Sequence, residues 1–216
     1  MSKLKSRRDA RAASANTLYT DRKALILKAA GNVFYRKGFL ATKLSDIAEE
    51  ANMDRASLYY YVGSKQDLFE NIFSTAVTDN IKDAKAVESE DISSLEKIAK
   101  LIELLMTSFE EKYPFFYILV QEDLKKISQI NDPKNEKWLA TNKQLSKEYF
   151  EIVKRMISKG IEDGEIQSTL PPALIAHSII GMVNSSSNWF LPNGIMTAKE
   201  IGAGMAKMIT HGLNSK

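Results

Sequence analysis

The stretch 42–68 constrains the fold of this chain more than any other, because it holds two short helical segments separated by a turn residue. Ser45 is placed to cap the first helix, and Asp54 is placed to cap a second helix over 55–62. Asn52 lies between them, and Asn adopts the left-handed backbone conformation more easily than most other residues with a side chain. Two short helices joined in this way predict a helix-turn-helix.

The outer face of the second helix is suited to DNA. Leu58 and Val62 are four residues apart and define its buried side. The opposite face carries small residues, hydroxyl groups and a guanidinium group, which can contact phosphates and base edges. Because the second helix of a helix-turn-helix enters the major groove, we expect this helix to read DNA.

The residues that we expect to touch DNA lie on and around this helix. Arg55 is the candidate for reading a base, because arginine pairs bidentately with guanine; a phosphate contact alone is the alternative. The three tyrosines over 59–61 either fill the core or bind phosphate. Lys65 is expected to bind a phosphate together with the N-terminus of the next helix. The full set is Thr42, Lys43, Ser45, Arg55, Ala56, Ser57, Tyr59, Tyr60, Tyr61 and Lys65.

Residues 26–68 resemble the TetR family of bacterial regulators. Asn52, Tyr61 and Val62 stand where that family usually has Gly, His and Phe, and each keeps the role of the residue it replaces. The resemblance implies a ligand-responsive transcriptional regulator, most often a repressor. The matching positions are Ile26, Ala29, Ala30, Phe34, Gly38, Thr42, Ile47, Ala48, Ala51, Leu58, Tyr59, Ser64, Lys65 and Leu68.

Charge is distributed unevenly along the chain. Residues 1–65 contain 13 Lys and Arg against 6 Asp and Glu, a net charge of +7, whereas the remaining residues have 17 against 21, a net charge of −4. A basic N-terminal third predicts that a polyanion binds at one end. Ordinary surface charge is one alternative. A helical protein-interaction module whose basic end binds an acidic partner is another.

The pattern of residues divides the chain into three parts. Residues 1–20 are basic and lack helical periodicity, so we expect a flexible arm; they also look faintly like a mitochondrial presequence, but the bacterial resemblance favours the arm. Residues 21–65 form the helix-turn-helix DNA-binding domain, whose first helix is capped by Asp21 and ends before Gly38. Residues 66–216 form a helical ligand-binding and dimerisation domain. Apolar residues at helical spacing predict an all-α protein of about nine helices.

The sequence contains no pattern that indicates catalysis or a metal site. It has no Cys, which excludes a disulfide scaffold, a thiolate metal site and a cysteine nucleophile. His177 and His211 are the only histidines, and neither lies in a metal-binding motif. No stretch approaches the roughly 20 apolar residues of a membrane span. We therefore expect a protein that is not an enzyme and has no metal, cofactor or membrane span. The family resemblance implies a bacterial cytoplasmic protein that is associated with the nucleoid when it is bound to DNA.

The C-terminal helices are unusually apolar. The run 176–183 is apolar nearly all round, which fits either an ordinary core or a face for self-association. The resemblance implies a homodimer joined by the last two helices into a four-helix bundle. A two-fold dimer suits a palindromic operator with half-sites about 34–36 Å apart. The interface candidates are Ile179, Met182, Val183, Met205 and Met208.

Aromatic residues in the body either line a cavity or fill it, and composition alone leaves both readings open. The tail over 181–213 resembles a TetR subgroup that responds to acyl-CoA thioesters, although Ser185 stands where a second Trp is usual. The resemblance implies a small-molecule effector of that class. Lys147, Lys154 and Arg155 are available for its phosphates. The pocket candidates are Phe109, Phe116, Trp138, Tyr149 and Trp189.

Overall fold

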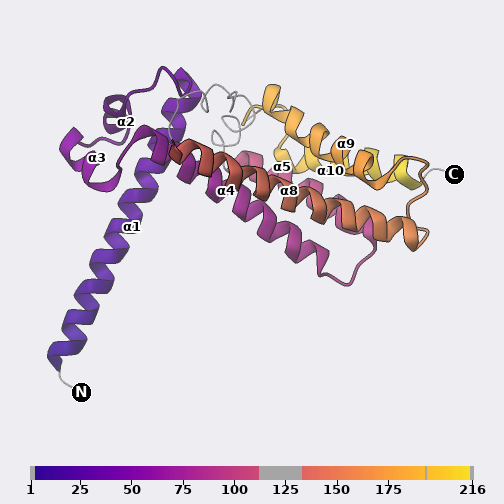
Figure 1. The fold of residues 1–216 in the computed structure, drawn as a ribbon, viewed down its shortest axis with the longest axis horizontal. Helices are drawn as coiled ribbons and strands as arrows, with labels where there is room; N and C mark the ends of the chain where they lie inside the picture. The colour runs from indigo at the N-terminus through magenta and orange to yellow at the C-terminus, as the bar shows by residue number, and fades with distance from the viewer. Residues whose placement is uncertain (1–2, 112–132, 193, 215–216) are drawn as a thin grey trace. The chain divides into compact units, whose positions relative to one another are not determined.

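The computed structural model describes residues 3–111, 133–192 and 194–214, and all regular elements in these ranges are helices (Figure 1). The all-α prediction is therefore confirmed. Eight α-helices and one short 3-10 helix lie in the described residues, against the predicted nine or so. The very apolar run over 115–124, whose sequence predicts a short helix, lies outside them. The chain divides into two compact units, Met1–Ile72 and Phe73–Lys216.

The first unit contains α1 (Lys3–Lys37), α2 (Leu44–Glu50), α3 (Arg55–Tyr61) and the first turns of α4 (Lys65–Glu88). Apolar side chains from all four helices form its core, because each helix has one apolar face to remove from water. The rings of Phe34, Phe39 and Phe69 lie at its centre, with their centroids 4.8–6.0 Å apart. The most deeply buried residues of this core are Ile26, Ala30, Val33, Phe34, Phe39, Ile47, Leu58, Leu68 and Phe69.

The predicted start of the first helix is wrong. α1 begins at Lys3 rather than at Asp21, so the residues expected to form an arm without regular structure are the N-terminal half of one continuous helix (Figure 1). Residues 3–20 contain no Gly or Pro and are rich in Ala, Arg, Leu and Lys, which have high helix propensity. Extending an existing helix avoids the cost of nucleating one, so these residues continue the helix that packs in the core.

The first helix of the helix-turn-helix is capped differently from the prediction. α2 begins at Leu44, which places Ser45 inside the helix and Lys43 at the cap position. The carboxylate of Asp46 accepts a hydrogen bond of 2.9 Å from the backbone N–H of Lys43. This is the backbone half of a capping box, and a negative charge in the first turn is also favoured by the helix dipole. Asp46 rather than Ser45 therefore stabilises this end.

The other local predictions in this unit are confirmed. Gly38 ends α1 with φ 75°, and its N–H donates to the carbonyl oxygen of Phe34 at 2.7 Å. Asn52 has φ 51°, the left-handed conformation that the turn requires. Ser64 caps α4, because its hydroxyl oxygen accepts from the N–H of Asp67 at 3.0 Å.

The second unit contains the rest of α4 with α5 (Ser94–Glu111), α8 (Pro133–Glu162), α9 (Pro172–Ser185), the 3-10 helix η1 (Ser186–Asn188) and α10 (Ala198–Asn214). α10 packs closely on α5, because a Cβ atom at Gly202 would lie 3.0 Å from Cα of Glu103. A capping box begins α10, with Thr197 N–H donating to the Glu200 carboxylate at 2.8 Å and Glu200 N–H donating to the Thr197 hydroxyl at 3.2 Å.

Two ion pairs join α4 to α8 in the second unit. Lys85 lies 2.6 Å from a carboxylate oxygen of Glu148. Arg155 donates two hydrogen bonds, of 2.8 and 2.9 Å, to the carboxylate of Glu88. A bidentate pair of this kind fixes orientation better than a single contact. None of the helices in the described residues is long and apolar enough to cross a membrane.

Candidate nucleic-acid interface

α3 presents an exposed outer face. Asp54 caps this helix as predicted, accepting hydrogen bonds from the backbone N–H of Ser57 at 2.9 Å and from its hydroxyl at 2.6 Å. Those bonds lower the pKa of Asp54, with the side-chain bond as the larger cause. Leu58 is fully buried, which fixes the rotation of the helix. Arg55 and Ala56 are exposed in its first turn, the part of a reading helix that contacts base edges.

The tyrosines of α3 are mostly outside the core. Tyr59 and Tyr60 are exposed by 57% and 75%, whereas Tyr61 is half-buried. The rings of Tyr60 and Tyr61 lie 5.2 Å apart, edge to face, and the ring of Tyr19 from α1 lies 5.1 Å from Tyr61 and 6.4 Å from Tyr60. The core-filling alternative therefore does not hold for Tyr59 and Tyr60. Sequence reasoning missed Tyr19, because the sequence predicts no fixed place on the module for residues 1–20.

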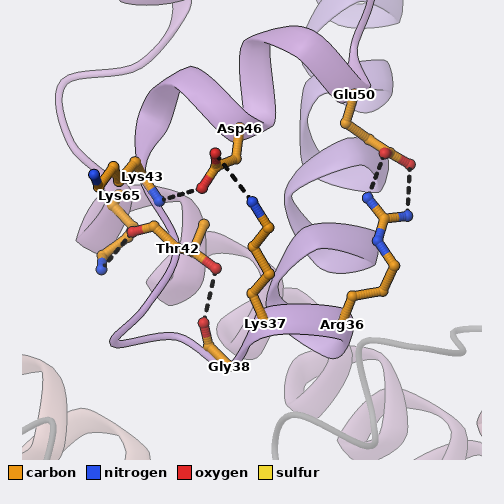
Figure 2. Close-up of polar contacts among 8 residues, drawn as sticks. All are labelled: Arg36, Lys37, Gly38, Thr42, Lys43, Asp46, Glu50 and Lys65. Carbon is orange, nitrogen blue, oxygen red and sulfur yellow. Dashed lines mark hydrogen bonds and ion pairs between the residues drawn. The ribbon is translucent and has the colours of Figure 1, made fainter.

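The structure places Lys65 inside the module rather than toward solvent. Its ammonium group donates to the carbonyl oxygens of Phe39 at 2.7 Å and Leu40 at 3.2 Å. It also donates to the carbonyl oxygen of Thr42 at 2.8 Å (Figure 2). These three carbonyls belong to the loop between α1 and α2. A lysine has three donors, so a phosphate contact would have to replace one of these bonds. The position of Lys65 indicates that it stabilises the loop, and the phosphate contact expected from the sequence stays a prediction.

Three of the residues predicted to contact DNA, Thr42, Lys43 and Ser45, lie just before α2 or in its first turn. Thr42 is only 2% exposed, and its hydroxyl donates to the carbonyl oxygen of Gly38 at 2.7 Å (Figure 2). A buried hydroxyl that already has an acceptor stabilises the turn, and the DNA contact expected of Thr42 stays a prediction. Lys43 is exposed and Ser45 is half-exposed, and both keep a position that a DNA backbone can reach.

Charged pairs hold α2 against α1. Arg36 forms a bidentate pair with Glu50, which also accepts from Asn32 at 3.1 Å, and Lys37 lies 3.1 Å from Asp46 (Figure 2). The hydrogen bond from Arg36, followed by that from Asn32, lowers the pKa of Glu50. These pairs are largely exposed and contribute little individually to stability. Their effect is to fix the angle of α2, and with it the angle at which α3 is presented.

The predicted pocket residues do not form one set. Phe109 is buried in the core, Trp189 is 51% exposed, and Phe116 lies outside the described residues. Trp138 and Tyr149 both lie on α8. The ring of Trp138 packs edge to face on the ring of Phe73 from α4, with the centroids 5.2 Å apart.

Two polar side chains on α8 are buried without hydrogen-bond partners among the described residues. They are the amide of Asn142, which is 4% exposed, and the hydroxyl of Tyr149. Burial, together with the negative charge of Asp83, raises the pKa of Tyr149, so this phenol stays protonated. Asn142 and Tyr149 are seven residues apart, about two helical turns, and share one face of α8. Sequence reasoning missed Asn142, although its spacing of four residues from Trp138 could have indicated it.

The residues predicted to form the dimer interface are partly buried in the chain's own core and partly exposed. Ile179 and Val183 are 2% and 1% exposed and pack in the core of the single chain, so they are not available to a second copy. The reason is that the apolar run on α9 has one side that meets the chain's own body. Met182 and Met205 are half-buried, and Met208 is 69% exposed. The exposed apolar residues of α9, α10 and the segment between them are Leu174, Trp189, Leu191, Ile195, Met196 and Met208.

A capped helix with an exposed arginine and tyrosines, held by a turn against a second short helix, defines a helix-turn-helix protein of the DNA-binding class. Comparison with protein families agrees with this class. Residues 26–72 match the model described as bacterial regulatory proteins, tetR family, and residues 91–213 match the tetracyclin repressor-like C-terminal domain. The chain belongs to the TetR family of DNA-binding transcriptional regulators, which are not enzymes.

Individual relatives extend over most of the chain. The HTH-type transcriptional repressor KstR2 of Mycobacterium tuberculosis is 24% identical over 199 residues, covering 90% of this chain and 94% of the relative. The crystal structure of the TetR family regulator PfmR from Thermus thermophilus is similar with a TM-score of 0.75 and 27% identity, covering 88% of this chain and 99% of PfmR. The structure of AibR in complex with isovaleryl coenzyme A and operator DNA is similar with a TM-score of 0.69 and 21% identity, covering 87% of this chain and 97% of AibR.

Proposed function

We propose that this protein is a homodimeric repressor that binds a palindromic operator through α3 and leaves it when a small molecule binds the helical body. The observation that carries the proposal is the exposed Arg55 in the first turn of α3, a helix whose rotation is fixed by the Asp54 cap and the buried Leu58. In this arrangement Arg55 reads a base edge, and Lys43, Ser45, Tyr59 and Tyr60 contact the flanking phosphates. The operator lies in chromosomal DNA, so the protein works in the cytoplasm at the nucleoid.

The dimer face that we propose is the exposed apolar part of α9 and α10. Leu174 and Met208 are exposed by 48% and 69%, which is costly for a surface in water unless another chain covers it. Met182 and Met205 are half-buried beside the core and can adapt to a second copy, because methionine is flexible and polarisable. Replacing Leu174 or Met208 by Glu is expected to produce monomers in sedimentation equilibrium. The matched control is Ile92→Glu, at an exposed apolar residue between α4 and α5.

The effector site that we propose lies along the face of α8 that is turned toward α4. Trp138 supplies an apolar wall there, and the unpartnered amide of Asn142 and hydroxyl of Tyr149 supply donors and an acceptor. A buried polar group without a partner costs free energy, so such groups are retained where something binds them. These side chains suit an effector that is mainly apolar and carries an uncharged polar group.

The effector class that we propose is an acyl-CoA thioester or a molecule of similar length and amphipathic character. The proposal is supported by the tail resemblance over 181–213 and by the similarity of the fold to AibR, whose complex contains isovaleryl coenzyme A. Three cations on α8 are the predicted candidates for the effector's phosphates. Of these, Lys154 pairs with Glu151 at 3.1 Å and Arg155 pairs with Glu88, while Lys147 is exposed. A phosphate at Arg155 would therefore compete with an ion pair that joins α8 to α4.

Competition between an effector phosphate and the ion pair of Arg155 with Glu88 offers a route by which the effector releases the operator. α4 has residues in both compact units, so a change in its pairing with α8 can alter how the reading helices are presented. An effector shifts this equilibrium only by the difference in its affinity for the two arrangements, and a shift from 1:99 to 99:1 requires about 5.5 kcal/mol.

The test combines two measurements on the purified protein. Thermal unfolding is followed with free acids, coenzyme A, acyl-CoA thioesters and small uncharged aromatics, because a ligand at a hundredfold excess over its Kd stabilises the folded state by about 2.7 kcal/mol. Operator binding is then titrated with each stabilising compound. Stabilisation by a thioester with matching loss of operator binding supports the proposal. Stabilisation only by small uncharged aromatics overturns the thioester assignment.

A further inference from the structure

A buried hydrogen bond joins α4 to α5 in the second unit. The hydroxyl of Ser108 donates to the side-chain carbonyl oxygen of Asn80 at 3.1 Å. Ser108 and Asn80 are only 6% and 8% exposed, so the bond lies out of solvent. Replacing both partners of such a bond by apolar residues of similar shape is often neutral or even stabilising. Packing alone therefore does not account for this pair.

The position of Asn80 relative to α8 follows from contacts between α4 and α8. These contacts advance along both helices together, so the two helices run in the same direction (Figure 1); they are Phe73 with Trp138, Lys85 with Glu148 and Glu88 with Arg155. Asn80 comes seven residues, about two helical turns, after Phe73 and shares its face of α4. Leu145 has the same relation to Trp138 on α8. Asn80 is therefore level with the part of α8 between Asn142 and Tyr149.

That part of α8 carries polar groups that lack a hydrogen-bond partner among the described residues. Neither the nitrogen nor the oxygen of the Asn142 amide has one, and neither does the buried hydroxyl of Tyr149. The amide nitrogen and the phenol can donate, whereas the amide oxygen can only accept. The carbonyl oxygen of Asn80 has two lone pairs, so it can accept a second bond beside that from Ser108. A group that binds here meets donors on α8 and acceptors on both helices.

We propose that the effector carries a hydroxyl group within its apolar part, and that Asn80 is a specificity-determining residue that binds this hydroxyl together with Asn142 and Tyr149. The inference rests on the proposed effector site between α4 and α8 and deepens it by naming the group that the site recognises. A hydroxyl donates one hydrogen bond and accepts two, which matches acceptors on both helices and donors on α8, whereas a carbonyl oxygen can only accept. In an acyl-CoA thioester the hydroxyl belongs to the acyl chain, because burying the charged phosphates among these neutral side chains would be costly.

The experiment follows thermal unfolding of the full chain with matched ligands at several concentrations. The ligands are dodecanoic acid, monohydroxylated dodecanoic acids with the hydroxyl near either end or in the middle of the chain, and the coenzyme A thioesters of these acids. A site that hydrogen-bonds a hydroxyl discriminates strongly against a ligand without it, whereas an apolar pocket does not. At least one hydroxylated isomer is expected to bind at least about tenfold more tightly than the unsubstituted compound of the same kind.

Two variants test which residues produce this preference. Asn142→Leu, and Asn80→Leu combined with Ser108→Ala, are each expected to bind hydroxylated and unsubstituted ligands with equal Kd. The double change removes both partners of the buried bond, so it leaves no polar group of that pair unpaired and the fold is retained. Leu145→Met, level with Asn80 on α8, is the matched control and should keep the full preference.

Equal binding of hydroxylated and unsubstituted ligands by the wild-type protein, or binding of neither, would overturn the inference. A preference that persists in the variant at Asn80 and Ser108 would show that Asn80 does not determine specificity. Titration of operator duplex with the preferred compound tests the proposed function separately. A hydroxylated ligand that binds selectively and leaves the affinity for operator unchanged would contradict release by the effector, while the recognition of the hydroxyl would stand.

Discussion

The ammonium group of Lys65 donates a hydrogen bond of 2.7 Å to the carbonyl oxygen of Phe39 and lies 4.5 Å from the centre of that residue's ring. Lys65 is the first residue of α4, and Phe39 lies in the loop that leads to α2. The contact therefore ties the beginning of the helix that has residues in both units to the helix-turn-helix. Lys65 therefore has a role inside the module that the sequence did not indicate.

The first prediction follows from this contact. Lys65→Met leaves loop carbonyls without their donor, and such losses cost about 1–3 kcal/mol, so the midpoint of thermal unfolding should fall. Affinity for every duplex should fall with it, while the salt slope stays nearly constant. Lys65→Arg should restore neither the midpoint of thermal unfolding nor the affinity for duplex, because a planar guanidinium cannot donate to three convergent carbonyls as an ammonium does.

Lys43→Met is the matched control for this prediction, since Lys43 is an exposed lysine beside the same loop. It should lower the salt slope by about 0.9 and leave thermal unfolding unchanged. If Lys65→Met instead lowered the slope in the same way and left stability intact, Lys65 would be a phosphate ligand after all.

The second prediction concerns base reading. Arg55→Ala should relax operator preference at one base position of each half-site, at a cost of roughly 1–3 kcal/mol per contact. Arg55→Lys keeps the charge but loses the planar fork, so it should retain the salt slope and still lose the preference. Titrations against operator and scrambled duplex measure both effects. An unchanged ratio of the two affinities in Arg55→Ala would show that Arg55 does not read a base.

The third prediction concerns acid. Hydrogen bonds from the side chain and then the backbone of Ser57 hold the pKa of Asp54 below its ordinary value of 3.8. A carboxyl whose pKa is lower in the folded state stabilises the fold fully above its unfolded value and loses that contribution as pH falls through its folded value. The capping contribution should therefore disappear below about pH 4.

Circular dichroism melts between about pH 2.5 and pH 6 test this pH dependence. Asp54→Asn keeps a capping side chain without a charge, so its melting midpoint should fall less steeply below about pH 4 than that of wild type. Ser57→Ala keeps the carboxylate but removes the larger cause of the pKa shift. The fall of its melting midpoint with pH should therefore be intermediate between that of wild type and that of Asp54→Asn. Parallel curves for all three proteins would contradict the assignment of the cap.

The fourth prediction separates stability from effector binding. Asn142→Leu and Tyr149→Phe each remove a buried polar group that has no partner among the described residues, so the effector-free protein should become as stable as wild type or more so. The same variants should bind the effector less tightly and release the operator at higher effector concentrations. Leu145→Met, between them on α8, is the control and should change neither. Destabilised variants with normal release would place the effector elsewhere.

Local features of this fold could be predicted from the sequence because they depend on residues within one turn. Gly38, Asn52 and the Asp54 cap each satisfy a backbone requirement of their neighbours, and all three are confirmed. The contact between Lys65 and Phe39 joins residues 26 positions apart. No pattern in the sequence indicates which carbonyls a lysine will meet at that distance.

Packing and helix extension explain the other differences between what the sequence predicts and what the structure shows. Ile179 and Val183 belong to an apolar run with two candidate destinations, the chain's own core or a second copy, and periodicity cannot distinguish them. The sequence places Tyr19 in an arm because residues 1–20 lack an apolar stripe, yet high helix propensity suffices to extend a helix that is already nucleated. The family resemblance indicates the general function correctly, whereas the role of individual side chains depends on three-dimensional contacts.

Selection of bound duplexes from a random pool, followed by sequencing, tests directly whether a dimer of this protein reads a palindromic operator through α3. A dimer that reads DNA through α3 should enrich palindromes whose half-sites are centred about 10–10.5 base pairs, or a multiple of that spacing, apart. Arg55→Ala should lose the enrichment at one position in each half-site. Retention of duplexes without any shared sequence by the wild-type protein, or the same enriched palindrome with Arg55→Ala, would contradict the account.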